Sequence, residues 1–303
     1  MQEDQPGPSV PTVEVCYRHP EEQTRVHCTR CERPICPACM IPAPVGHQCP
    51  ECVKEARKEF REGPGKRART LGRMSATKAL MIAILALFVR EVVTGGPRAL
   101  LEGPSLQRLI DLGGLFPPAV ADGQYWRLLS SMFLHFGLIH IAFNAYALWL
   151  FGRLVEENLG RTRFLVIYFV SGFLAGAASY AFGPVNAVGV GASGAIFGVF
   201  GAFLAYNYRR RHLALAAANL RWAFTLILIN ALLAFTFRAI DWRAHLGGLA
   251  AGAIAGYLAE GVGPRSTRQA VQWVGFIALI AAGAALVVWR TSELRSAFAP
   301  FFV

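Results

Sequence analysis

A few polar side chains lie where the sequence is otherwise almost free of charge. From Phe164 to Tyr208 there is no Asp, Glu, Lys or Arg, yet Ser193 stands in this run within Gly191-Ala192-Ser193-Gly194 and opens an apolar stretch. His245 lies just inside the start of another apolar stretch. A serine that donates a hydrogen bond to a histidine is an activated nucleophile. The two residues therefore predict acyl-transfer chemistry.

His140 and Asn144 form a second polar pair. They are four residues apart, so they share one face of a helix. With the backbone N–H of Ser193 at a helix start, they could stabilise an oxyanion that develops during acyl transfer. Each residue also has an ordinary alternative, because a serine in a membrane helix usually bonds to its own backbone and a lone histidine is often a structural bridge. Four polar groups at one depth favour the catalytic interpretation.

A third set of reactive side chains is confined to residues 16–52, which hold all seven cysteines of the chain. Four pairs with two-residue spacers supply eight metal ligands, because His19 stands where an eighth cysteine would: Cys16 and His19, Cys28 and Cys31, Cys36 and Cys39, Cys49 and Cys52. Such a spacer lets a tight turn direct both side chains to one ion, and eight ligands suit two tetrahedral zinc sites. We expect two structural Zn ions, because so short a segment cannot build a core without metal.

This arrangement resembles a small B-box-like zinc finger. The resemblance implies cross-braced sites, with Cys16, His19, Cys36 and Cys39 on one ion and Cys28, Cys31, Cys49 and Cys52 on the other. Because such fingers often end in histidines, His47 is an alternative to one of the last cysteines, although a surface histidine beside the site is favoured. The segment is either a docking module for a cytoplasmic protein or a folded cap without a partner, and both interpretations stay open.

The composition predicts an all-α membrane protein around the polar residues. The chain is 54% hydrophobic and 16% charged, against about 25% charged residues in soluble domains. A membrane span needs about 20 apolar residues. Seven stretches qualify as spans, near 78–94, 138–156, 163–182, 192–208, 222–240, 243–260 and 271–289. We attribute the net charge of +11 to Lys and Arg residues that set the topology and contact anionic lipid. No nucleic-acid partner is expected.

The distribution of Lys and Arg orients these spans. Placing the N-terminus in the cytoplasm puts 18 of these residues in inner segments and 8 in outer ones, which satisfies the positive-inside rule and leaves the C-terminus outside. The spans starting near 138, 192 and 243 then all run inward, so the four polar residues lie near outer ends. Glycines at four-residue intervals, such as Gly248 and Gly252, let helices approach closely.

Taken together, the motifs resemble the rhomboid family of intramembrane serine proteases over about residues 115–257. The matching residues are Tyr125-Trp126-Arg127, His135, His140-x3-Asn144, Gly152-x3-Glu156-x3-Gly160-x3-Phe164, Gly191-Ala192-Ser193-Gly194 and Asp241-x3-His245-x2-Gly248-x3-Gly252. The resemblance implies six core helices with a seventh C-terminal one, Ser193 as nucleophile and His245 as general base without a third acid. Asp241 is then a helix cap, and Phe197 stacks on His245.

We therefore expect a B-box-like zinc-binding domain at 1–53, a basic linker at 54–77, a protease core at 78–260 and an extra helix and tail at 261–303. The predicted activity is cleavage of a transmembrane helix in a membrane-protein substrate, near the outer face of the bilayer. The predicted location is the plasma membrane of a bacterium. The alternative is a non-catalytic chaperone or retention factor on the same fold. A small-solute channel is disfavoured because no charged ring crosses the bundle.

Overall fold

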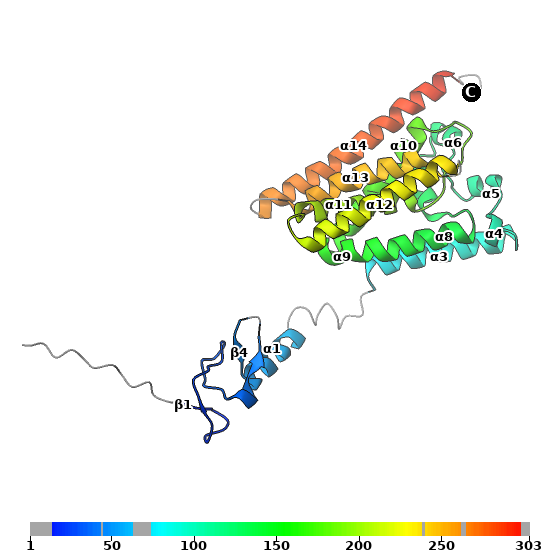
Figure 1. The fold of residues 1–303 in the computed structure, drawn as a ribbon. Coiled ribbons are helices and arrows are strands. Elements are labelled where there is room, and N and C mark those ends of the chain that lie inside the picture. The colour runs from blue at the N-terminus through cyan, green and yellow to red at the C-terminus, as the bar shows by residue number, and fades with distance from the viewer. Residues whose placement is uncertain (1–13, 44, 63–73, 238–239, 262–264, 298–303) are drawn as a thin grey trace, which may run out of the picture. The chain divides into compact units, whose positions relative to one another are not determined.

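The computed structural model describes residues 14–43, 45–62, 74–237, 240–261 and 265–297. The chain divides into one unit that ends at Arg73 and a second that begins at Met74 (Figure 1). Residues 63–73 of the predicted linker and residues 1–13 and 44 of the predicted zinc domain lie outside the described residues.

The first unit is built around its cysteines and has very little apolar core. All of them except Cys31 are buried, and Ile35 is the one fully enclosed aliphatic side chain among the described residues of this unit. Helix α1 extends to Glu62, so the first part of the predicted linker is helical. The elements are β1 (Glu14–Val15), β2 (Gln23–Thr24), the 3-10 turn η1 (Pro37–Cys39), β3 (Ile41–Pro42), β4 (His47–Gln48) and α1 (Pro50–Glu62), with β1 antiparallel to β2 and β3 antiparallel to β4.

The second unit is a helical bundle, as the composition predicted. Its long helices are α3 (Ala76–Gly95), α8 (Gly137–Ala147), α9 (Arg153–Leu159), α10 (Arg161–Phe182), α11 (Ser193–Arg209), α12 (Ala214–Thr236), α13 (Trp242–Glu260) and α14 (Arg265–Ala297). A π-helical turn, η3 (Leu148–Gly152), joins α8 to α9. Between α3 and α8 lie the short elements α4 (Ala99–Glu102), α5 (Leu106–Asp111), α6 (Pro117–Ala121), α7 (Arg127–Ser130) and η2 (Ser131–Phe133).

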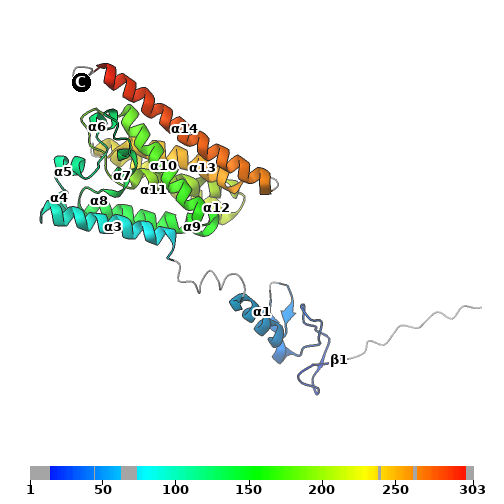
Figure 2. The same ribbon diagram turned by 180° about the vertical axis from the view of Figure 1, so that it is seen from behind.

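Helices α10, α11 and α13 lie in the middle of the bundle, and α3 and α14 lie on opposite edges (Figures 1 and 2). The contact between α11 and α13 is made by glycines. A Cβ atom added at Gly252 would overlap the backbone of Gly198, and one added at Gly248 would overlap the carbonyl oxygen of Gly194. The four-residue glycine repeat therefore brings two backbones together, as small residues do in membrane helices.

Four helical segments are long and apolar enough to cross a membrane: Gly137–Leu159, Arg161–Phe182, Ala214–Ala234 and Ser266–Ala297. The other three predicted spans also form helices. Of these, α3 carries Lys78, Arg90 and Glu91, α11 has 17 residues, and α13 is rich in Gly and Ala. Contacts with neighbouring helices can cover the polar groups of these three helices inside a membrane. The four apolar helices can face lipid directly.

Two predicted spans differ from the observed helices. Helix α12 begins at Ala214, eight residues before the predicted start, because the segment from Ala214 to Leu220 is rich in the strong helix formers Ala and Leu. Helix α14 covers Arg265–Ala297, well beyond the predicted 271–289. Its additional turns are polar, so hydropathy alone did not include them.

Glu156 fixes the start of α3 from a distant part of the chain. Its carboxylate accepts hydrogen bonds from the backbone N–H groups of Ala76 (2.7 Å) and Thr77 (2.9 Å) and from the Thr77 hydroxyl (2.7 Å). The first N–H groups of a helix have no partner within the helix. Glu156 on α9 therefore caps α3 and ties the two helices together.

The C-terminal end of α14 is tied to α10 and to the short helix α6. The hydroxyl groups of Tyr180 on α10 and Thr291 on α14 lie 2.9 Å apart in a buried contact, and Arg295 Nε donates to the carbonyl oxygen of Ala121 at 2.8 Å. Helix α14 is therefore held by polar contacts as well as by apolar packing.

We predict that Gly252→Val destabilises the bundle by about 1–3 kcal/mol or more, because added volume at a backbone contact cannot be relieved by a side-chain rotation. Ala250→Val, on an exposed position of the same helix, is the matched control and should change stability little. Thermal or denaturant unfolding in detergent micelles measures both. Equal stability of the two variants would contradict the close α11–α13 contact.

Candidate functional site

Ser193 is the first residue of α11, and the loop before it is pinned at two points. Leu115 and Gly189 exchange backbone hydrogen bonds of 2.9 and 2.8 Å, and the N–H of Gly191 donates to the carbonyl oxygen of Ser131 at 2.9 Å. Gly191 has φ +126°, a conformation that residues with a Cβ atom rarely adopt. The backbone conformation therefore requires a glycine at position 191, two residues before the serine.

His245 lies in the first turn of α13 and faces Ser193. Its Nε2 atom is 2.9 Å from Ser193 Oγ. The imidazole stacks on Phe197, one turn after the serine, with 4.2 Å between ring centroids and 12° between the ring planes. With the proton on Nδ1, Nε2 accepts the hydrogen bond from the serine hydroxyl, which is the geometry of a nucleophile beside its base.

Asp241 caps the start of α13. Its Oδ1 accepts from the N–H groups of Arg243 (3.1 Å) and Ala244 (3.2 Å), and its Oδ2 accepts from the Ser179 hydroxyl. Within the described part of the chain, no side-chain hydrogen bond joins the carboxylate to His245. The N-cap role explains its position one turn before the histidine.

His140 and Asn144 both face Gly191. A Cβ atom at Gly191 would lie 2.8 Å from His140 Nε2 and 3.7 Å from Asn144 Nδ2. His140 Nδ1 accepts the backbone N–H of Phe136 at 3.2 Å, so the ring proton of the neutral imidazole is on Nε2. Asn144 is 5% exposed, and its Nδ2 has no hydrogen-bond partner among the described residues. Two donors therefore point at the backbone two residues before the serine.

Two further buried groups stand beside this site, and the sequence analysis gave neither a role. Glu91 on α3 accepts the backbone N–H of His135 at 3.0 Å, and the His135 ring lies 5.2 Å from that of His140. Both side chains are at most 1% exposed. Glu91 lies inside the first predicted span, near 78–94, and an ionisable residue inside a span is a functional candidate by default.

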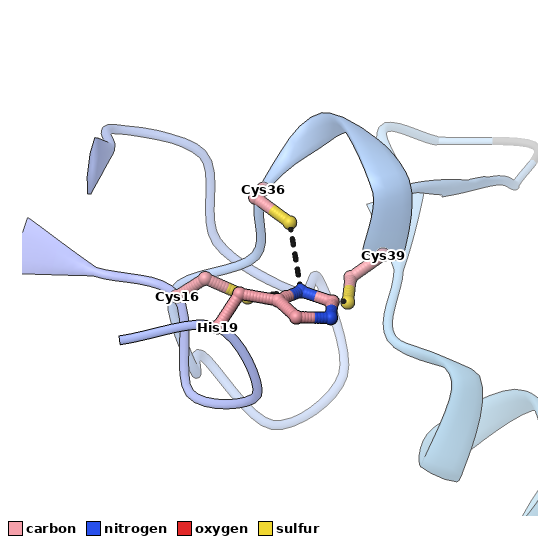
Figure 3. A group of neighbouring side chains, drawn as sticks. All are labelled: Cys16, His19, Cys36 and Cys39. Carbon is pink, nitrogen blue, oxygen red and sulfur yellow. Dashed lines mark hydrogen bonds between the residues drawn. The ribbon is translucent and has the colours of Figure 1, made fainter. Parts of the chain in front are cut away.

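The first cysteine cluster gathers Cys16, His19, Cys36 and Cys39 (Figure 3). His19 Nδ1 lies 3.9, 3.2 and 3.5 Å from the sulfur atoms of Cys16, Cys36 and Cys39. Tetrahedral bonds of the lengths typical of zinc would place nitrogen and sulfur ligands about 3.5 Å apart. The four atoms therefore fit a tetrahedral metal ion.

The second cluster gathers Cys28, Cys31, Cys49 and Cys52. The sulfur atoms of Cys31 and Cys49 are 3.8 Å apart, the spacing of about 3.8 Å that tetrahedral thiolates would have. Arg33 donates to Cys31 Sγ at 3.3 Å, and this hydrogen bond lowers the pKa of the Cys31 thiol. A lower pKa favours the thiolate, the form that binds metal. His47 lies in β4 and is not among the four ligands.

A family model, described as the Rhomboid domain, matches residues 122–260. This segment contains all four polar residues of the site on the bundle. It excludes both cysteine clusters, α3 and α14.

Several curated proteins are similar to this chain. "Rhomboid protease GluP" of Bacillus subtilis (strain 168) is 36% identical over 175 residues, 57% of this chain and 32% of the relative. "Putative rhomboid protease YdcA" of the same organism is 37% identical over 139 residues, 46% of this chain and 69% of the relative. "Inactive RHOMBOID-like protein 8" of Arabidopsis thaliana is 33% identical over 150 residues, 48% of this chain and 42% of the relative. The chain thus spans only about a third of the length of GluP.

Asp241→Asn should lower the stability of the bundle by less than about 1 kcal/mol, because an asparagine oxygen can still accept the capping hydrogen bonds, and should keep most of the chemical reactivity of Ser193. Labelling by a serine-reactive fluorophosphonate probe measures that reactivity, and thermal unfolding measures the cap. Loss of labelling in a folded variant would instead assign Asp241 a role as the third acid.

Elemental analysis of the purified chain should give two divalent metal ions per molecule. A strong chelator should unfold residues 16–52, whose core consists of metal ligands. The bundle should keep its own unfolding transition, since its described residues include no such cluster. One ion or none per chain would refute the two-site interpretation.

Proposed function

The chain belongs to the rhomboid family, and from this premise we propose that it is an intramembrane serine endopeptidase with Ser193 and His245 as its catalytic dyad. It is an integral membrane protein, since the family assignment and four apolar helices agree. The observation that carries the proposal is the 2.9 Å contact between Ser193 Oγ and His245 Nε2, with Phe197 stacked behind the imidazole.

In the proposed reaction, the Ser193 hydroxyl transfers its proton to His245 Nε2 as Oγ attacks the scissile carbonyl carbon. The carbonyl electrons move to oxygen, and the oxyanion accepts hydrogen bonds from His140 Nε2, Asn144 Nδ2 and the N–H of Ser193. When the C–N bond breaks, the amine leaves with the proton from His245. Water then attacks the acyl carbon with His245 again as base, the bond from this carbon to Ser193 Oγ breaks, and Oγ takes the proton from His245 as the carboxylic acid is released.

The proposed substrate is a membrane protein whose transmembrane helix enters sideways past α12. Only 11% of the most apolar stretch of α12 is buried, against 67% of that of α10, so α12 is the less buried of the two helices. An intact helix hides its carbonyl groups in hydrogen bonds, so helix-destabilising residues should favour cleavage. The dyad lies at the N-terminal ends of α11 and α13, which the Lys and Arg bias places toward the outer face.

For the first unit we propose two structural zinc ions, because thiolate and imidazole ligands in tetrahedral sets favour zinc. A cytoplasmic N-terminus suits this proposal, since reduced thiols persist there. The proposed location is the plasma membrane of a bacterium, with the C-terminus outside. Among the described residues nothing points to a protein partner for this unit, and none is proposed.

The rival function is that of a non-catalytic rhomboid-like chaperone or retention factor. One relative is named as inactive, so membership of the family alone does not decide the matter. A catalytically dead chain would be expected to lack the serine or the histidine. Both are present here within hydrogen-bond distance, which favours the protease.

Ser193→Ala and His245→Ala should each lower cleavage of a model transmembrane substrate at least about a thousandfold, because residues that act as one unit fail together. A fluorophosphonate probe should label the wild type at residue 193 and leave Ser193→Ala unlabelled. Ser292→Ala and His212→Ala, both exposed, are the controls and should retain activity. Turnover by folded Ser193→Ala would rule out the dyad, and a wild type that is neither labelled nor active would favour the rival.

A further inference from the structure

Helix α12 turns one face toward the bundle, and that face carries two amides. Its buried or half-buried positions include Ala216, Asn219, Ala223, Leu226 and Asn230. Asn230 lies eleven positions after Asn219, which makes about three helical turns, so the two side chains leave the helix within about 20° of each other. Both amides therefore point into the bundle.

Only one of the two amides has a partner on a neighbouring helix. Asn219 Nδ2 donates to Asn207 Oδ1 on α11 at 2.9 Å, which ties the two helices near the turn that joins them. Asn230 Nδ2 instead donates to the carbonyl oxygen of Leu226 on its own helix at 2.9 Å. Within the described residues, Asn230 Oδ1 accepts no hydrogen bond.

The Asn207–Asn219 contact also fixes the depth of Asn230. A short turn joins α11 to α12, so the helices are antiparallel. Asn230 lies about 16 Å along α12 from this contact, and Phe197 lies about 15 Å along α11 in the same direction. Phe197 stacks on His245, and Ser193 is about 6 Å further toward the same end. Asn230 is therefore about one helical turn deeper than the nucleophile.

An amide at this depth, with no partner on a neighbouring helix among the described residues and a free acceptor oxygen, matches what a cleavable helix would need. Unwinding a helix in lipid frees backbone N–H and C=O groups that no water can satisfy. The donors His140 and Asn144 would serve the scissile carbonyl alone. An asparagine side chain offers an acceptor and two donors, and can therefore pair with both kinds of backbone group.

We propose that Asn230 is a specificity-determining residue, which hydrogen-bonds the backbone of the unwound substrate segment one turn inside the scissile bond. The inference rests on the proposed protease function and adds to it a named contact for substrate selection. It predicts a preference for substrates with helix-breaking residues at that depth, beyond any requirement at the scissile bond itself.

The test uses the full-length protein in proteoliposomes and two model transmembrane substrates. They differ only in having Gly-Gly or Leu-Leu one turn inside the scissile bond. Asn230→Leu, which removes the amide at similar volume, should lower kcat/KM on the Gly-Gly substrate about five- to tenfold, the worth of one hydrogen bond. It should change kcat/KM on the Leu-Leu substrate less than twofold. Asn230→Ala is the second variant, and fluorophosphonate labelling verifies that each variant is folded.

Thr225→Val is the matched control, because Thr225 is a polar residue on the exposed face of the same helix. It should leave both rates unchanged. An equal fall on both substrates for Asn230→Leu and Asn230→Ala would assign the residue to helix packing and overturn the inference, as would an unchanged substrate preference. A wild type that cleaves neither substrate would refute the proposed function itself, and the inference with it.

Discussion

The backbone contact between α11 and α13 is the constraint on which the rest of the bundle depends. Lipid tails are as apolar as leucine, so helices in a bilayer gain little from apolar side chains and associate through close packing. Gly198 and Gly252 let these two backbones meet without intervening side chains. Because Ser193 and His245 lie in the first turns of the same two helices, this contact also sets the distance between the proposed nucleophile and its proposed base. The same glycine contact thus affects both the stability of the bundle and the geometry of the candidate site.

The two units are held together by different kinds of core. In the first, the described buried side chains are mostly cysteines gathered into two sets of metal ligands, since a segment this short cannot bury a large apolar core. The second has an extensive core of large apolar side chains such as Phe164, Ile167 and Phe200, and glycines bring the backbones of α11 and α13 together. Removal of the cysteine thiolates should therefore unfold the first unit, whereas larger side chains at the α11–α13 contact should destabilise the second.

Much of the site could be predicted because its residues carry local signals. Ser193 between glycines, the four-residue spacing of His140 and Asn144, and the eight ligand positions are all visible as short patterns. Glu91 and Asn230 could not be predicted in the same way, because each is a single polar residue inside an apolar stretch with no recognisable pattern around it. Their significance depends on which helix face they occupy and at what depth, and only the packed structure gives that information. The extent of α14 was missed for a different reason, since its additional turns are polar and hydropathy marks only the apolar length of a helix.

The cap on α3 has a consequence for the order in which the chain is assembled. The carboxylate of Glu156 is 80 residues later in the sequence than the Ala76 N–H group it accepts, and His135 is 44 residues later than Glu91. During synthesis, α3 therefore enters the membrane before either partner exists, and it carries the charged residues Lys78, Arg90 and Glu91. Helix α3 can therefore take up its final packing only after α9 has been made and inserted. The first helix of the bundle to be made is thus one of the last to be locked.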